Sequence, residues 1–174
     1  MLDKLIIINL KIMKKLLLVI AMVAVGLTAN AQEGKFNLGA SIGLPAADAD
    51  TGYDFAIGLE ANYLFSVSDN FQLGPSVSYS HYFGGNIAGF DIEDASFLPI
   101  AAAARFNASE KFIVGLDLGY AVGISPDAND GGFHYRPLVG YSVSDNTSIQ
   151  ASYSGVSVEG GTMANFGLGV VFGL

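Results

Sequence analysis

From residue 35 onward, apolar and polar residues alternate along the chain with a period of two. In the stretch FAIGLEANYLF, Ile57 and Leu59 fall on one face, whereas Gly58 and Glu60 fall on the other. This alternation is typical of β-strands that have one apolar face. Eight such runs follow one another, at residues 35–44, 55–65, 71–80, 97–107, 112–123, 133–141, 148–154 and 163–174. Most are close to the roughly 9–11 residues that a tilted strand needs to cross a bilayer.

The connections between these runs alternate in length. Three short ones resemble one another, because FSVSDN at 65–70 returns as YSVSDN at 141–146 and more loosely as FNASEK at 106–111. Their Ser, Asp and Asn residues are those that tight turns favour. The other four are predicted to be longer and are rich in Gly and acid: AADADTG, GGNIAGFDIED, SPDANDGG and VEGG. The sequence therefore predicts an up-and-down meander with both termini on the short-turn side.

A meander of eight antiparallel strands can close with its apolar face inward, as in a soluble lipocalin-like carrier, or outward into lipid. An eight-stranded barrel leaves little room inside. The polar face consists largely of small residues, namely Gly39, Ser41, Gly43, Gly58, Gly74, Ser76, Ser78, Gly115, Gly119, Gly140, Ser152, Gly167, Gly169 and Gly173. The large apolar side chains on the other face would overfill the interior. We therefore predict an all-β, eight-stranded antiparallel transmembrane β-barrel, with the soluble carrier as the alternative.

Aromatic residues flank the predicted strands at both ends. Phe65, Phe106 and Tyr141 precede the three short turns, and Phe71 and Phe112 follow two of them. Rings at these levels mark the membrane interfaces of a barrel. A second set lies near the opposite strand ends: Tyr53, Tyr82, Phe83, Tyr120, Phe133 and Tyr135.

The first 31 residues are predicted to be an N-terminal extension followed by a cleavable signal peptide that starts at Met13. Two lysines precede an apolar run at residues 16–27, which is too short for a membrane-spanning helix. Ala29 and Ala31 form the small-x-small pattern of a signal peptidase site. A retained anchor is the alternative. Residues 32–174 would then form the barrel domain.

Charge and composition exclude several classes of protein. The whole chain has a net charge of −8, and removing residues 1–31 takes away four lysines and one aspartate, which leaves −11. Nucleic acid is an unsuitable partner for such a chain, because phosphates are bound by Lys and Arg. The absence of Cys excludes disulfides and thiolate metal sites.

The C-terminal sequence GVVFGL carries the most specific motif. Gly169, Phe172 and Leu174 resemble the C-terminal signal of the small outer-membrane β-barrel family of Gram-negative bacteria, often called the porin or outer-membrane protein β-barrel family. The resemblance extends over the signal peptide and residues 35–174. It implies a location in the cell outer membrane, insertion by the barrel-assembly and periplasmic chaperone machinery, and contact with outer-membrane lipids. Most members have no known activity, and we expect a monomer.

Strand parity places four charged residues in the lumen, namely Glu60, Arg105, Asp117 and Arg136. Two acids and two bases in a narrow interior should pair, because an unpaired charge there is costly. We predict a structural salt-bridge network that closes the lumen. The alternative is a gated path, which would make the protein a narrow channel for small solutes.

No residue set predicts catalysis or a cofactor. Parity places His81 on the lipid side near the loop end and His134 in the lumen, and no serine is set apart as a nucleophile. We therefore expect no enzyme activity, and a structural or surface-interaction role.

Two features of the predicted barrel need a further explanation. The longer loops are acidic, and weak binding of divalent cations is one interpretation of Asp48, Asp50, Asp91, Glu93, Asp94, Asp127, Asp130 and Glu159. Pro75, Pro99 and Pro137 fall inside predicted strands, where each removes a backbone donor. We expect the prolines to be accommodated by local bulges, or by water in the lumen that hydrogen-bonds to the carbonyl groups left without a donor.

Overall fold

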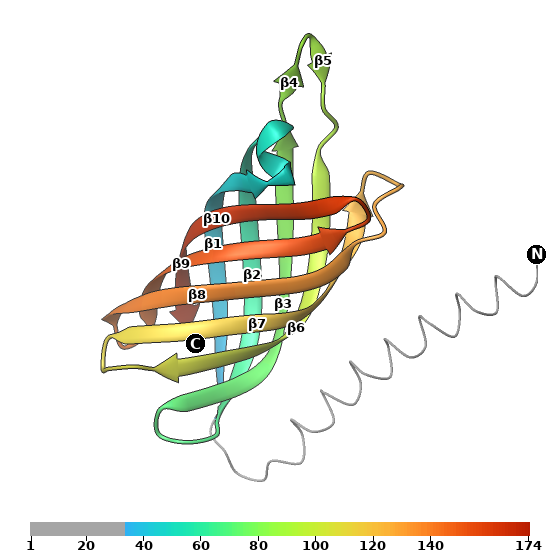
Figure 1. Cartoon of the computed structure of the whole chain (residues 1–174). Helices are drawn as coiled ribbons and strands as arrows, with labels where there is room; N and C mark the ends of the chain where they lie inside the picture. Colours follow the sequence, from blue (N-terminus) through green and yellow to red (C-terminus); the bar gives the residue numbers. More distant parts are fainter. Residues whose placement is uncertain (1–33) are drawn as a thin grey trace, which may run out of the picture. The chain divides into compact units, whose positions relative to one another are not determined.

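The computed structural model describes residues 34–174; the predicted signal peptide, with Met13, Ala29 and Ala31, lies outside them. Eight long strands form one closed barrel in the order β1-β10-β9-β8-β7-β6-β3-β2 (Figure 1). Every neighbouring pair is antiparallel. The strands are β1 Gly34–Ala47, β2 Tyr53–Ser66, β3 Phe71–Gly84, β6 Ala95–Asn107, β7 Phe112–Ser125, β8 Gly132–Ser144, β9 Thr147–Val158 and β10 Gly161–Gly173. The predicted eight-stranded antiparallel barrel is confirmed.

The apolar face of the sheet lies on the outside of the barrel. Ile42 and Phe166 are 68% and 62% exposed, whereas Asn62 on the inner face is 4% exposed. This arrangement is the opposite of a soluble carrier, in which large apolar side chains line the cavity. Within residues 34–174, no helix is long and apolar enough to cross a membrane.

The strands continue further toward the loop end than the alternation predicts. The largest difference is between β9 and β10, where only Glu159 and Gly160 connect the two strands. The predicted longer VEGG connection is therefore wrong. Gly160 has a φ of 89°, a positive value that glycine adopts without strain.

The connection between β3 and β6 contains a small hairpin of its own. Its strands are β4 Asn86–Ile87 and β5 Phe90–Asp91, and it extends beyond the barrel (Figure 1). Ala88 and Gly89 form the turn with φ angles of 52° and 89°. A short 3₁₀ helix, η1 Asp48–Thr51, lies between β1 and β2. Sequence alternation does not predict either element, because each is too short to show a period.

The three prolines that fall inside predicted strands are accommodated without bulges. Each lies where one of its two neighbouring ladders misses two successive residue pairs: Pro75 beside β2, Pro99 beside β3, and Pro137 beside β9. The register is the same before and after each gap. The expected bulges are therefore wrong at these positions. A proline lacks only the donor that points to one neighbour, so the ladder to its other neighbour stays intact.

Candidate functional site

The four charged residues predicted in the lumen contact one another. We call Arg105, Asp117, Arg136 and Glu60 the charge network. Arg105 Nη1 donates to Asp117 Oδ1 at 2.5 Å, and Arg136 Nε donates to Asp117 Oδ2 at 2.9 Å. Arg136 Nη1 forms an ion pair with Glu60 Oε2. Asp117 therefore lies between two guanidinium groups, and the network as a whole has no net charge.

The strands bring these side chains together from four different positions in the sequence. Glu60 lies on β2, Arg105 on β6, and Asp117 and Arg136 are paired across β7 and β8. The backbone leaves room for them at two glycines. A Cβ atom on Gly115 would lie 2.7 Å from Arg105 Cδ, and one on Gly39 would lie 2.8 Å from Glu60 Cγ. The small residues of the inner face thus provide the space that long charged side chains need.

The network is not fully hydrogen-bonded by protein groups. Among the described residues, Glu60 Oε1 and Arg105 Nη2 have no hydrogen-bond partner although both side chains are buried. A cavity of about 40 Å³ lies in the lumen beside Arg136 and Glu60, and about half of its lining consists of small Gly, Ala and Ser residues, including Ser41, Ser78 and Ser152. Because one water needs about 10–15 Å³ of such volume, the cavity has room for roughly three waters.

A second group of side chains closes the lumen near the loops. We call it the loop-end cluster; it consists of Ala49, Ala56, Tyr82, Ala95, Phe97, Ala121 and Val156. Tyr82 and Phe97 are each 1% exposed and pack edge to face. The hydroxyl of Tyr82 accepts a hydrogen bond from Asn165 Nδ2 at 2.8 Å. Aromatic pairs of this kind stabilise by more than their buried area alone.

The loop-end cluster corrects one part of the sequence interpretation. Tyr82 was expected at the membrane interface, but it points into the lumen. Tyr53 is also partly buried against the cluster. Strand parity already gives Tyr82 the same face as Gly74 and Ser76, and this signal could have identified it. The lumen is thus closed by apolar side chains near the loops and by the charge network farther inside.

The two histidines lie where parity places them, and they have different surroundings. His134 is 2% exposed in the lumen, and its Nδ1 lies 3.2 Å from the carbonyl oxygen of Gly155. His81 lies on the outer face, where Nδ1 is 3.3 Å from Tyr79 Oη and Nε2 is 3.1 Å from Asp94 Oδ2. Among the described residues, neither histidine has a serine hydroxyl as a partner.

Asp94 anchors the end of the loop between β3 and β6. Its Oδ1 accepts the backbone N–H of Gly84 at 2.8 Å, and its Oδ2 contacts His81. The Gly84 hydrogen bond, followed by the contact with His81, lowers the pKa of the Asp94 carboxyl group below its ordinary value. The carboxylate therefore holds the loop to the strand that precedes it.

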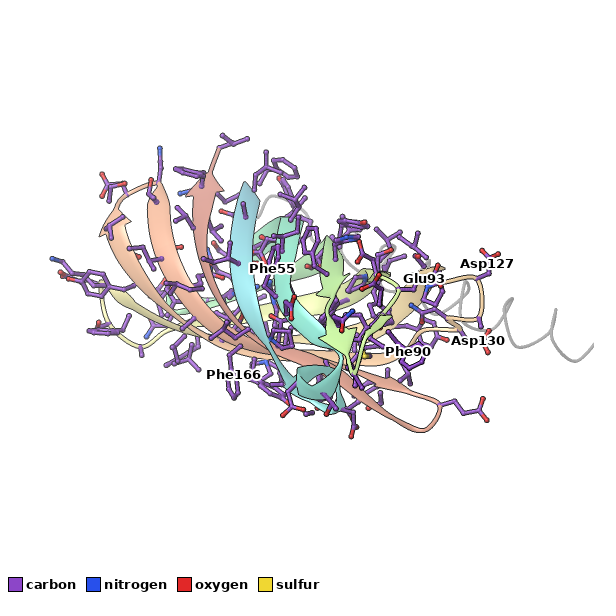
Figure 2. The ribbon with its side chains drawn as sticks, turned by 90° about the horizontal axis from the view of Figure 1, so that it is seen from above. Phe55, Phe90, Glu93, Asp127, Asp130 and Phe166 are labelled. Carbon is purple, nitrogen blue, oxygen red and sulfur yellow. The ribbon has the colours of Figure 1, made fainter. Side chains whose placement is uncertain are left out.

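Other loop carboxylates accept hydrogen bonds that stabilise the loop conformations. Asp48 Oδ2 accepts the Thr162 N–H at 2.7 Å, and Asp91 Oδ1 accepts a hydrogen bond from Asn86 Nδ2 at 2.7 Å. Glu93, Asp127 and Asp130 are seen with Phe90 in the view from above (Figure 2). In residues 34–174, no group of three His or acidic side chains lies close enough to hold a metal ion.

The C-terminal motif lies at the seam where the barrel closes. Phe172 and Leu174 are exposed on the outer face, at 51% and 75%. The Leu174 N–H donates to Phe36 O at 2.8 Å. Gly169 faces inward, and a Cβ atom there would lie 2.8 Å from the Ala40 carbonyl oxygen.

Solved structures with the same fold include three useful comparisons. Ail, the attachment invasion locus protein of Yersinia pestis, has a TM-score of 0.58 and 14% identity over 82% of this chain and 99% of its own. Neisserial surface protein A has a TM-score of 0.51 and 16% identity over 81% and 99%. A designed transmembrane β-barrel has a TM-score of 0.51 and 12% identity over 83% and 100%. These likenesses show the fold.

The family is shown by the sequence itself. A search of curated proteins found no match. The family model described as "Outer membrane protein beta-barrel domain" matches residues 16–173. With the apolar outer face and the closed eight-stranded barrel, this match excludes the soluble carrier. The chain belongs to the outer membrane protein beta-barrel domain family and is an integral protein of the outer membrane.

Proposed function

We propose that this protein is a closed, non-conducting barrel that presents its loops for contact at the cell surface, without enzyme activity. The observation that carries the proposal is closure of the lumen at two levels. The charge network bridges the lumen between β2, β6, β7 and β8, and the loop-end cluster fills the lumen nearer the loops. An eight-stranded barrel with both features has no continuous aqueous path.

The loop surface differs chemically from one that binds polyanions. Ail was also solved in complex with the heparin analogue sucrose octasulfate. In this chain, the loops at residues 48–52, 85–94, 126–131 and 159–160 contain no Lys or Arg. Sulfated sugars would meet carboxylates there, so we do not extend that ligand to this protein.

The partners proposed for assembly follow from the family and the C-terminus. We propose that the barrel-assembly machinery, with periplasmic chaperones, inserts the chain and reads Gly169, Phe172 and Leu174 as its signal. Phe172 and Leu174 then face outer-membrane lipids in the finished barrel. A monomer is the proposed state, since the barrel is closed by its own β1 and β10.

Single-channel recording in planar bilayers tests the closed barrel. The purified wild-type protein is expected to give no sustained openings. The matched variant combines Arg136→Met with Glu60→Gln, which removes both ion pairs of Arg136 and leaves the neutral Arg105–Asp117 pair. Both proteins must keep the folded, faster gel migration of an unboiled barrel. Large, long-lived openings by the wild type would contradict the proposal.

A narrow channel is the second candidate, and one observation favours it. The lumen holds the 40 Å³ cavity, and a wider mouth of about 850 Å³ opens between the short turns near Asp69, Glu110 and Lys111. If the charge network were the gate, the double variant would conduct while the wild type opened briefly. If the loop-end cluster also closes the lumen, both proteins stay closed.

A further inference from the structure

The β4–β5 hairpin carries an apolar pair outside the lipid-facing part of the barrel. Ile87 and Phe90 are directly opposite each other in the hairpin, so their side chains share one face. They are 41% and 77% exposed. The hairpin extends past the ends of the long strands (Figure 1). We therefore expect it to lie outside the acyl-chain layer. The face that Ile87 and Phe90 form is called the tip face below.

The hairpin is held in shape although its strands are only two residues long. The side chain of Asn86 donates to Asp91 Oδ1 at 2.7 Å and accepts the Gly89 N–H at 2.9 Å. At its base, the Ile92 N–H donates to Gly85 O, and the Gly85 N–H donates to Gly52 O, both at 2.9 Å. An isolated two-stranded hairpin is only marginally stable in water. These additional hydrogen bonds stabilise it, so the tip face is already ordered when a partner binds.

The charged residues at the loop end, where the tip face lies, have one sign. Of the basic residues between 34 and 174, Arg105 and Arg136 are used in the charge network. Lys35 and Lys111 lie at the short turns, where Lys35 Nζ donates to Asp145 O. The loop end therefore has carboxylates but no positively charged side chain to balance them. Figure 2 shows Glu93, Asp127, Asp130 and Phe90 at this end.

The exposed apolar pair and the negative charge of the loop end together indicate which partner suits the tip face. A second copy of the chain would bring the same carboxylates and be repelled, and an anionic lipid surface or polyanion would be repelled for the same reason. A cationic, amphipathic peptide segment complements both features, because its apolar side chains cover Ile87 and Phe90 while its Lys or Arg side chains meet the carboxylates.

We propose that the tip face, with the carboxylates of the loop end, is a docking site for a cationic amphipathic peptide segment. The proposal rests on the surface-contact role proposed above and names the partner's chemistry. Phe90 is its apolar anchor, since aromatic side chains that become buried dominate such contacts. The carboxylates speed the encounter and set the preference for positive charge.

Binding is measured with the full mature barrel in nanodiscs of zwitterionic phosphatidylcholine, with empty nanodiscs as the blank. The probe is a fluorescent synthetic peptide that forms a helix with leucines on one face and lysines on the other. Two control peptides replace the lysines by glutamates, or the leucines by serines. The first probe is expected to bind, with weaker binding as salt increases. Equal binding of either control peptide overturns the proposal.

Variants locate the site. Phe90→Ser is expected to weaken binding at least about tenfold, because an apolar anchor is lost. Glu93→Gln combined with Asp127→Asn is expected to weaken it further and to reduce its salt dependence. Val67→Ser is the matched control, since Val67 is 51% exposed in a turn at the opposite end of the barrel. Equal affinity of the Phe90→Ser and Val67→Ser proteins, both folded by gel migration, overturns the proposal.

A separate measurement distinguishes this proposal from the surface role on which it rests. The chain has no cysteine, so Ala88→Cys provides a single label site at the hairpin turn. Labelling of intact cells by a membrane-impermeant maleimide is expected. If the label fails, the proposed surface role is wrong. If the label succeeds and the peptide does not bind, the docking site alone is wrong.

Discussion

Asp117 on β7 and Arg136 on β8 are directly opposite each other, and Oδ2 of the aspartate lies 2.9 Å from both Nε and Nη2 of the arginine. Arg105 contacts the other oxygen of Asp117, and Glu60 contacts the other side of Arg136. The four charges therefore alternate in sign across the lumen, and each of them contacts at least one charge of opposite sign.

Arg136→Met should be strongly destabilising. The change leaves Glu60 without its ion pair, and breaking one partner of a buried pair costs about 3–5 kcal/mol. Adding Glu60→Gln should recover part of that loss, because the remaining Arg105 and Asp117 balance. Urea unfolding followed by circular dichroism in lipid vesicles measures both proteins. Lys111→Met, at the exposed rim, is the control, and an equal loss there would contradict the assignment.

Phe97→Ala should destabilise the barrel by about 3–5 kcal/mol, since it leaves a cavity beside Tyr82 in the loop-end cluster. Phe97→Leu keeps most of the volume and should cost less than half as much. The same unfolding measurement compares the two variants. Similar small losses for both would show that the loop end of the lumen is loosely packed.

The loop held by Asp94 should loosen in acid. Because the pKa of this carboxyl group is lowered in the folded state, its contribution is complete above the ordinary carboxyl pKa of about 4 and is lost as the pH falls through the folded value. The protection of the Gly84 amide against hydrogen exchange, relative to its intrinsic rate at each pH, should therefore fall in that acidic range. In Asp94→Asn this protection should be lower at neutral pH and should change little in acid. A wild-type rate that follows only the intrinsic pH dependence would contradict this expectation.

Ala88→Asn should stabilise the hairpin. Ala88 has a φ of 52°, which costs energy for alanine, and Asn-Gly is the preferred pair for a hairpin turn with positive φ at both positions. We expect a gain of up to about 1 kcal/mol in the local opening equilibrium, because Asn tolerates the left-handed region better than Ala. Hydrogen exchange at the Ile92 amide measures it, and Ala128→Asn in another loop is the control. Faster exchange at Ile92 in the Ala88→Asn protein would contradict the turn geometry.

The sequence predicted what depends on alternation. The faces of Glu60, Asp117 and Arg136, the outward direction of Ile42 and Phe166, and the antiparallel order of the strands all follow from a period of two. The family resemblance is confirmed by the family match.

The features that the sequence did not predict depend on where residues lie along the barrel axis and on the conformation of single residues. Parity says that Tyr82 faces inward, but it does not say that Ala49 of η1 lies near enough to pack beside it. The Glu159–Gly160 turn and the β4–β5 hairpin are set by a few φ angles, which composition does not reveal. The gaps at Pro75 and Pro137 depend on which neighbour each missing donor would have faced.

The four loops should differ in how well they tolerate the insertion of foreign sequence. Ala49 in the first loop is fully buried in the loop-end cluster. Foreign sequence inserted into this loop would displace Ala49 and disrupt the packing of the cluster. The Glu159–Gly160 turn is open to solvent, because nothing lies within 4 Å of a Cβ atom placed on Gly160. An epitope added there would be displayed at the cell surface while the interior of the barrel stayed as it is.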